Sequence, residues 1–233
     1  MNIFSDEIEQ QAIQRIQKFS KIAKTMRFEI YLGFSGGKDS QVVYVLCLRS
    51  GVKFKAYFNH SFESSITRQF IRENYPNVIR RRDYKYGFIE NIWKVHNVFL
   101  PTVQAAYCCY DYKHKPKYVD ACSIVGVRKA ESAKRKQRTA FETKNKTVLK
   151  KNKALIDDYF EENCQSVGTA SVIQLKPIID WSDKDVWDYN RDYSNDKCYY
   201  ICRWLNHSFM PFTKKQKKLY EKVREAYCQK QDW

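Results

Sequence analysis

The stretch EIYLGFSGGKDSQVVYVLCLRSG, residues 29–51, changes its hydrophobic pattern in the middle. Residues 29–34 are rich in β-branched and aromatic side chains, which indicates a short strand. Residues 39–50 place apolar side chains on one face of a helix, and Gly51 is a typical helix stop. The strand and the helix are joined by the turn Ser35-Gly36-Gly37-Lys38-Asp39-Ser40.

This turn has the composition of a phosphate-binding loop. Glycines allow backbone N–H groups to face a ligand, and the start of a helix carries partial positive charge. Lys38 adds a full charge, and Ser35 and Ser40 add hydroxyl groups. A plain turn with a Ser or Asp N-cap would require neither both glycines nor the lysine. The spacing also differs from the P-loop G-x-x-x-x-G-K-(S/T), because Asp39 follows the lysine.

The six residues resemble the PP-loop of the N-type ATP pyrophosphatases, which carry it at a strand-to-helix junction near the N-terminus. The resemblance implies that residues 35–40 bind ATP with Mg²⁺, and that ATP is split into AMP and pyrophosphate while a substrate is activated as its adenylate. Lys38 would neutralise charge on the leaving pyrophosphate, and Asp39 would orient the loop or contact Mg²⁺. Phe58 and Asn59 end the second expected strand, where this family recognises adenosine.

A second motif is SIVGVRKAESAKR, residues 123–135. We expect a strand ending at Gly126 and a helix opening with Arg128. Spacings of four and three would place Arg128, Ser132 and Arg135 on one helical face; a basic surface helix is the alternative. The motif resembles the G-(V/L)-R-x-x-(E/Q)-S-x-x-R element of the phosphoadenosine phosphosulfate (PAPS) reductase family. The resemblance implies that the arginines and the serine bind phosphate or phosphosulfate, with both arginines neutralising the adenylate or its acceptor.

A third motif is LKPIIDWSDKDVWDYNRDY, residues 175–193. Ser182 is expected to cap a helix with Asp185 at the third position, and Trp181 and Trp187 are expected to pack in the core. The pattern P-I-x-D-W-(S/T)-x-x-D-V-W closes the domain in PAPS reductase-like proteins. Three motifs in the family's order therefore predict membership of the PAPS reductase and PP-loop superfamily.

The choice between ATP and PAPS depends on two features. Reductases of the family carry a degenerate loop without the Lys-Asp pair, and a C-terminal Glu-Cys-Gly-(I/L)-His nucleophile. This chain keeps Lys38 and Asp39 and ends in AYCQKQDW, where Cys228 lacks the Glu, Gly and His. The sequence therefore favours an adenylating enzyme, closest in motif to DNA-phosphorothioation-type members and acting in sulfur transfer or nucleic-acid modification. A PAPS or adenylylsulfate reductase and a non-catalytic nucleic-acid-binding module are the alternatives.

The cysteines suggest a metal centre. A pair of adjacent cysteines and a second pair much later in the chain resemble the four ligands of a [4Fe–4S] cluster in family members. The second pair is spaced C-x-x-x-C here, whereas the family usually has C-x-x-C. The resemblance implies the ligands Cys108, Cys109, Cys198 and Cys202, with Cys164 as a rival. Zinc or plain reduced thiols are the other interpretations.

Charge and composition limit the partners. The chain has 233 residues and a formal net charge of +16. Residues 128–153 hold eleven basic and two acidic side chains, a local +9, so this segment is either a solvated loop or a nucleic-acid footprint. Residues 1–11 are polar and acidic, and no apolar run approaches the ~20 residues that span a bilayer. We expect a cytoplasmic protein without a membrane partner; the oligomeric state is left open.

Alternation of strands and helices predicts a Rossmann-like α/β fold, with a parallel sheet and helices on both faces. We expect a nucleotide-binding domain over residues 1–195, with a polar insertion or lid at about 141–168, and an extension over 196–233. The expected helices are 7–25, 39–50, 64–74, 182–193 and 213–229, with a helix-rich stretch at 86–122. The expected strands are 29–34, 53–58, 77–81, 123–127 and 171–176.

Overall fold

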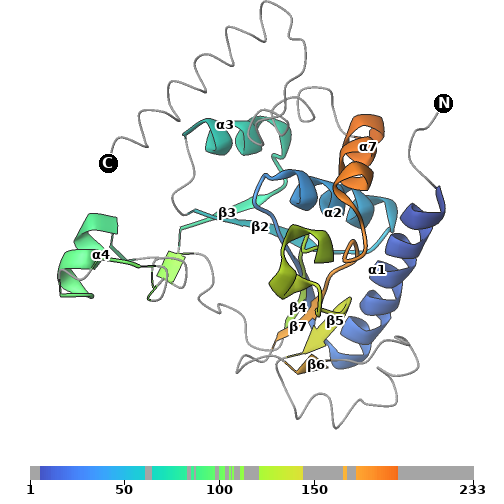
Figure 1. The fold of residues 1–233 in the computed structure, drawn as a ribbon, viewed down its shortest axis with the longest axis horizontal. Coiled ribbons are helices and arrows are strands. Elements are labelled where there is room, and N and C mark those ends of the chain that lie inside the picture. The colour runs from blue at the N-terminus through green and yellow to red at the C-terminus, as the bar shows by residue number, and fades with distance from the viewer. Residues whose placement is uncertain are drawn as a thin grey trace, which may run out of the picture.

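The fold is built on a sheet whose strands follow the order β3-β2-β1-β4-β7-β5-β6 (Figure 1). The computed structural model describes residues 6–60, 65–82, 85–86, 88–97, 100–102, 105, 107, 111–112, 121–143, 165–166 and 172–193. The strands are β1 (Glu29–Gly33), β2 (Lys55–Asn59), β3 (Ile79–Arg81), β4 (Ala121–Ile124), β5 (Phe141–Thr143), β6 (Gln165–Ser166) and β7 (Val172–Leu175). The helices are α1 (Asp6–Met26), α2 (Lys38–Arg49), α3 (Ser65–Asn74), α4 (Phe88–Lys94) and α7 (Asp183–Tyr193), with 3-10 turns η2 (Lys129–Glu131) and η3 (Ala133–Arg135).

The sheet is mostly parallel. β1 pairs in parallel with β2 and β4, β2 with β3, and β4 with β7. β5 is antiparallel to β7 and parallel to β6. Helices connect or follow the parallel strands, as parallel pairing requires. The α/β class expected from the sequence is therefore confirmed.

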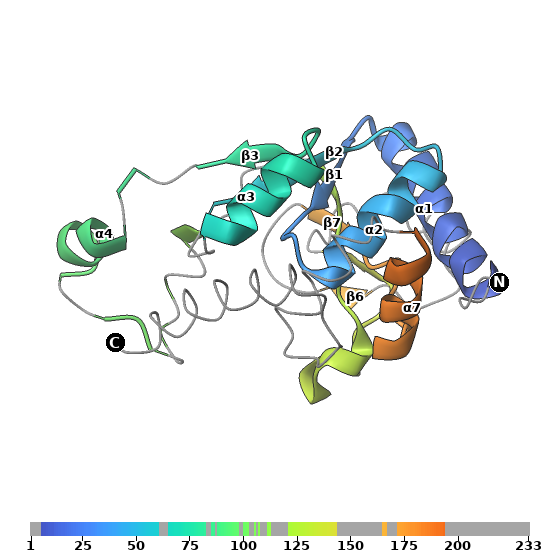
Figure 2. The same ribbon diagram turned by 90° about the horizontal axis from the view of Figure 1, so that it is seen from above.

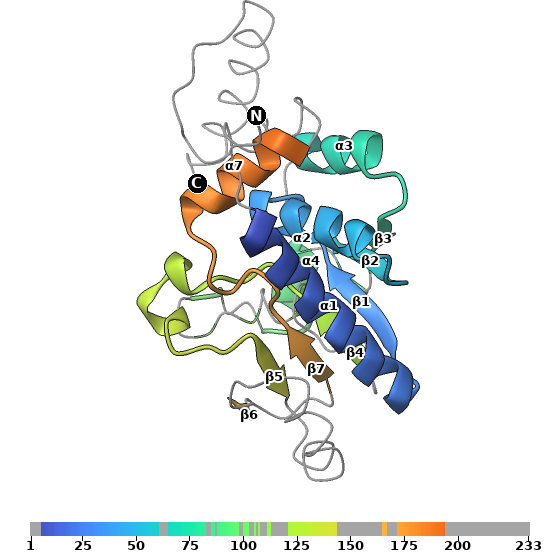
Figure 3. The same cartoon turned by 90° about the vertical axis from the view of Figure 1, so that its right-hand side faces the viewer.

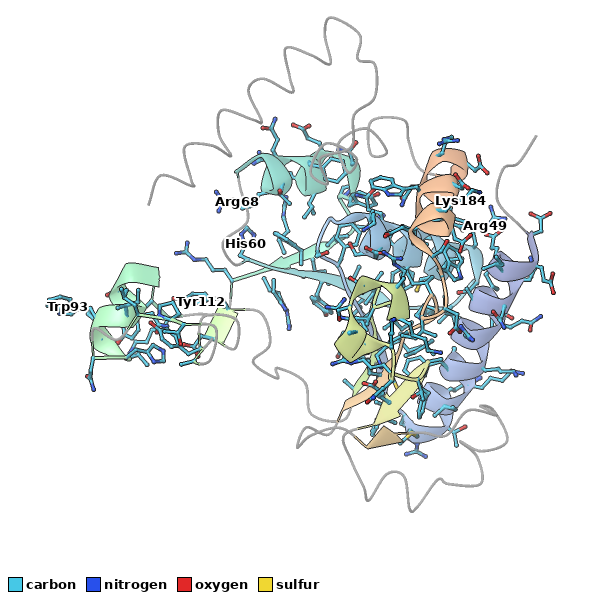
Figure 4. The ribbon with its side chains drawn as sticks, viewed as in Figure 1. Arg49, His60, Arg68, Trp93, Tyr112 and Lys184 are labelled. Carbon is cyan, nitrogen blue, oxygen red and sulfur yellow. The ribbon has the colours of Figure 1, made fainter. Side chains whose placement is uncertain are left out.

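Helices α1, α2 and α7 pack against one another (Figure 3). Glu9 of α1 is 1% exposed, forms an ion pair with Arg49 of α2 and accepts a hydrogen bond from the Tyr189 hydroxyl of α7. A buried carboxylate is tolerated only with such partners, so Glu9 fixes the three helices in one arrangement. α3 lies beside α2, and α4 lies away from the sheet with Trp93, 68% exposed, projecting from it (Figures 2 and 4).

Most expected elements lie within two residues of their predicted bounds, including the helix before β1 and the helix after the turn at 35–40. No described helix is long and apolar enough to cross a membrane. The boundary at residue 195 and the expected helix 213–229 lie outside the described residues.

The expectation for residues 123–135 is wrong in part. β4 ends at Ile124, and no α-helix opens at Arg128; η2 and η3 replace it. Ser132 between them is extended, with φ −166° and ψ 157°, which interrupts any helix. The spacing of four and three therefore does not place the two arginines and Ser132 on one helical face.

The insertion expected at about 141–168 is not an insertion at its two ends, which form strands β5 and β6. Phe141 is fully buried in β5 and packs edge-on against Phe19 of α1, with ring centroids 6.0 Å apart. Glu142 in the same strand forms a buried ion pair with Lys176. Residues 165–166 form β6 beside β5. The segment therefore begins and ends within the sheet; residues 144–164 lie outside the described part.

Candidate nucleotide site

The turn at residues 35–40 lies at the point where the strand order reverses. β1, β2 and β3 run to one side of the sheet, whereas β4 and β7 lie on the other side of β1. In open parallel sheets, ligands bind beyond the carboxyl ends of the strands at this switch point. The turn follows β1 and opens α2, so it occupies this position (Figure 1).

No side chain caps the start of α2. The N-cap residue is Gly37, with φ −75° and ψ 162°, and it makes no side-chain cap hydrogen bond. Both serines instead bond within the turn: Ser35 Oγ accepts from the Gly37 N–H at 3.3 Å, and Ser40 Oγ donates to the Gly37 carbonyl at 2.8 Å. A helix start without a side-chain cap suits an anionic ligand, because its first N–H groups have no partners within the helix.

The two glycines of the turn serve different purposes. Gly36 has φ +79°, and a Cβ there would lie 2.9 Å from the Cδ1 atom of Ile71 on α3. Gly36 is therefore required by the fold itself. Among the described residues, a Cβ on Gly37 would meet only the Ser35 hydroxyl oxygen, at 3.4 Å. The described part of the protein thus leaves room for a side chain at Gly37, so its small size favours the approach of a ligand.

Replacing Gly37 with alanine should therefore separate folding from binding. We expect the free energy of unfolding to change by less than ~1 kcal/mol, since only an N-cap preference is altered. Affinity for ATP should fall at least about tenfold, the equivalent of one lost hydrogen bond to a charged group. Chemical denaturation and calorimetric titration measure the two quantities. Equal ATP affinity in Gly37→Ala and wild type would show that no phosphate approaches the backbone here.

Two side chains from outside the turn hold its backbone, and a third supports one of them. Gln41 of α2 donates to the Gly36 carbonyl at 2.7 Å, and the Tyr75 hydroxyl donates to the Gln41 side chain at 2.9 Å. Asn190 of α7 donates to the Lys38 carbonyl at 3.2 Å. Our sequence analysis missed these residues. None of them carried a local signal, because each reaches the turn or its support from another part of the chain or through its side chain alone.

Four charged side chains meet beside the turn. Lys38 Nζ lies 3.3 Å from Asp39 Oδ2 and 3.7 Å from Asp183 Oδ1. Arg128 forms ion pairs with both carboxylates. Its Nη2 lies 2.7 Å from Asp183 Oδ1, and its Nε pairs with Asp39 Oδ1. The hydrogen bond from Arg128 is the main cause that lowers the pKa of Asp183 below its usual value. Two cations and two carboxylates thus form one cluster with no net formal charge.

Asp183 and Trp187 were not predicted as site residues, yet both contact Lys38. Lys38 Nζ lies 5.8 Å from the centre of the Trp187 ring, in a cation–π arrangement. Trp181 is 2% exposed in the core, as expected, whereas Trp187 is only half-buried. Asp185 accepts hydrogen bonds from the Ser182 backbone and hydroxyl, which confirms the expected cap of α7.

The remaining expected site residues are only partly brought together. Gly126 packs directly on the turn, since a Cβ there would lie 2.9 Å from Asp39 backbone atoms. Phe58 is buried at the end of β2, and Asn59 is the last residue of that strand. Ser132 is exposed, and Arg135 forms an ion pair with Glu131.

The expected cluster ligands Cys108, Cys109, Cys164, Cys198 and Cys202 all lie outside the described residues. The [4Fe–4S] cluster therefore stays a prediction. Of the described cysteines, Cys47 and Cys122 are buried, and burial raises the pKa of both thiols, that of Cys122 to about 12. The described residues contain no group of three or more His, Cys, Asp or Glu side chains that would hold a metal ion.

Comparison with known families decides the relationship. The family model described as "Phosphoadenosine phosphosulfate reductase domain" matches residues 29–198, more than half of the chain. The chain belongs to this family. The matched range begins with β1, includes the turn at 35–40 and continues beyond α7, so all three sequence motifs fall within the family domain. The turn at residues 35–40 and the α/β fold around it are thus part of the family domain in this protein.

Individual relatives are distant. An uncharacterized protein of Methanocaldococcus jannaschii is 23% identical over 212 residues, a match that covers 83% of this chain and 43% of the relative. The chain thus spans less than half the length of this curated relative. The solved structure of NMN synthetase from Francisella tularensis covers 94% of both chains, with a TM-score of 0.44 and 12% identity. A likeness this loose carries no argument about function.

Proposed function

We propose that the protein binds ATP with Mg²⁺ at residues 35–40 and transfers AMP to an acceptor with release of pyrophosphate. The observation that carries this proposal is the Lys38–Asp39 pair, placed in the first turn of an uncapped helix at the sheet's switch point. In the reaction, an acceptor nucleophile would attack the α-phosphorus. The bond from the α-phosphorus to the bridging oxygen would break, and pyrophosphate would leave with its electron pair.

The chain's own groups have distinct roles in this reaction. The backbone of the turn and the Lys38 ammonium would hold the β- and γ-phosphates, and Lys38 would neutralise charge on the leaving pyrophosphate. Mg²⁺ prefers one or two carboxylates together with phosphate oxygens and waters, and the carboxylates of Asp39 and Asp183 fit that preference. When bound, Mg²⁺ would offset phosphate charge. Asn59, at the carboxyl end of β2, would face the adenosine.

Product analysis with three nucleotides tests the reaction. The protein would be incubated separately with ATP, PAPS and adenylylsulfate, each with Mg²⁺ and a dithiol as reductant, and pyrophosphate and sulfite would be measured. We expect pyrophosphate from ATP, with water taking the AMP slowly when no other acceptor is present, and no sulfite from the other two. Sulfite release would instead identify a reductase. Failure to bind any of the three in a calorimetric titration would favour a non-catalytic module on the same fold.

For the acceptor, we propose a nucleic acid or a sulfur-carrying group, with the basic segment 128–153 as the nucleic-acid contact. Of the six basic residues in its first part, 128–143, three form ion pairs within the protein: Arg128 with Asp39 and Asp183, Lys129 with Asp180, and Arg135 with Glu131. The basic residues at 144–153, outside the described part, are therefore the better candidates for phosphate contacts.

Neutralising Lys150, Lys151 and Lys153 to glutamine should flatten the salt dependence of RNA or DNA binding. The slope of log K against log salt should fall by up to about one unit for each lost phosphate contact. Fluorescence anisotropy over a salt series measures this slope. If the triple variant binds with an unchanged slope, the segment makes no phosphate contacts.

A further inference from the structure

Arg128 is among the most deeply buried large side chains in the described part of the protein, with 1% of its surface exposed. Each of its three guanidinium nitrogens donates to a protein acceptor. Nε donates to Asp39, Nη2 to Asp183 at 2.7 Å, and Nη1 to the Trp181 carbonyl at 3.3 Å. A buried guanidinium requires such partners, and these three point it into the protein rather than toward a ligand.

The two carboxylates belong to different parts of the site. Asp39 lies in the first turn of α2, after β1, and its side chain is 16% exposed. Asp183 is the first residue of α7, after β7, and its side chain is 69% exposed. Arg128 follows β4, which lies between β1 and β7 in the sheet. One planar guanidinium therefore links the carboxyl ends of three neighbouring strands.

The loop that carries Arg128 is itself fixed. The Arg128 backbone N–H donates to the Glu131 carboxylate at 2.8 Å. The Lys129 backbone N–H donates to the Ile179 carbonyl, also at 2.8 Å. The backbone at Arg128 is thus fixed by hydrogen bonds, while its guanidinium binds the two carboxylates. A residue with these contacts orients other side chains instead of contacting a substrate.

We propose that Arg128 is a positioning residue, and that Asp183 is its functional partner in the nucleotide site. The Asp39–Arg128–Asp183 bridge, rather than a contact of Arg128 with phosphate, sets where Lys38 and Asp39 meet the nucleotide. This inference rests on the proposed function and deepens it. It assigns a role to Asp183, which no sequence motif marked.

The bridge also controls Lys38. Lys38 Nζ lies within 4 Å of both carboxylates, at 3.3 Å from Asp39 and 3.7 Å from Asp183. Arg128 already neutralises part of their charge, so Lys38 can exchange these carboxylates for a phosphate. Without the bridge, Asp39 and Asp183 would compete with the nucleotide for the Lys38 ammonium, and Asp39 would lose its fixed orientation.

A double-mutant cycle tests the bridge. The full-length wild type, Asp183→Ala, Arg128→Met and the double variant would be compared for kcat/KM of pyrophosphate release and for the Kd of Mg·ATP by calorimetry. We expect about a tenfold loss in kcat/KM or in affinity for Asp183→Ala. The variant should be less stable but still folded, because Arg128 keeps its bonds to Asp39 and to the Trp181 carbonyl. The double variant should be no worse than Arg128→Met alone, because both changes break one bridge.

Two further variants serve as comparisons. Arg128→Lys should not restore function, because one ammonium cannot replace the guanidinium fork between two carboxylates. Asp180→Ala is the matched control: Asp180 lies three residues before Asp183 and pairs with Arg15 and Lys129 instead of the turn. It should behave as wild type.

Several results would overturn the bridge. Losses that multiply in the double variant would show that Arg128 acts independently of Asp183, as a direct phosphate contact would. If Asp183→Ala keeps the wild-type kcat/KM and affinity, Asp183 has no role in the nucleotide site. This comparison remains valid even if Arg128→Met fails to fold. A wild type that neither binds Mg·ATP nor releases pyrophosphate would overturn the proposed function itself, and the bridge with it.

Discussion

Replacing Gly126 with alanine is expected to destabilise the protein by about 1–3 kcal/mol, the usual cost of overpacking. The new Cβ would lie 2.9 Å from the backbone carbon and oxygen of Asp39 and 3.1 Å from the backbone nitrogen of Ser40. These are backbone atoms in the first turn of α2, so they cannot rotate out of the way. Either the loop after β4 or the PP-loop must move.

The same substitution should also weaken nucleotide binding, because the displaced atoms belong to the turn that we propose as the phosphate site. Denaturant unfolding and calorimetric titration with Mg·ATP measure the two effects. For stability, Gly33→Ala is the control, since a Cβ there would make only ordinary contacts, at 3.6 Å from a Val125 methyl carbon and 3.8 Å from the Ile124 carbonyl. If both variants are as stable as wild type, the contact between the two loops is looser than the structure indicates.

Local sequence signals predicted the part of the fold around the PP-loop. The strand before it is β-branched and aromatic, the helix after it is amphipathic, and Gly51 with φ +70° ends that helix. These features act within a few residues along the chain, so the sequence alone contains them. The observed β1 and α2 begin and end within one residue of the expected bounds.

Features that depend on distant partners were not predicted. Arg128 turns inward to Asp39 and Asp183, which lie 89 and 55 residues away, and the backbone after it does not form the expected helix. β5 is short, and its pairing with β7 depends on the buried Glu142–Lys176 ion pair and on Phe141 packing under α1. A polar, lysine-rich stretch gives no periodic signal for such a strand.

In the candidate site, too, the residues with local sequence signals were predicted, and those that depend on distant contacts were not. Residues 35–40 and Gly126 were identified because glycine-rich turns have a local signature. Asp183 was not identified as a site residue, because an aspartate in the first turn of a helix is ordinary there. Its contact with the loop becomes visible only when α7 packs against α2.

Replacing Lys38 with alanine is expected to lower ATP affinity by about 1.5–3 kcal/mol, or roughly 10- to 150-fold. The variant would lose the charged donor that we propose for the triphosphate, while Asp39 and Asp183 keep Arg128 as their partner, so the fold should be retained. Lys55→Ala is the matched control. Lys55 pairs with Glu29 at the opposite end of β1 from the loop, and its loss removes the same charge.

Calorimetric titration of Mg·ATP into wild type, Lys38→Ala and Lys55→Ala tests the central claim that residues 35–40 bind the triphosphate of ATP. Binding does not require the acceptor, so the measurement is decisive before the acceptor is identified. We expect saturable binding of one ATP to wild type and to Lys55→Ala, and binding weakened at least about tenfold in Lys38→Ala. Equal affinity in all three proteins, or no binding to wild type, would contradict the claim.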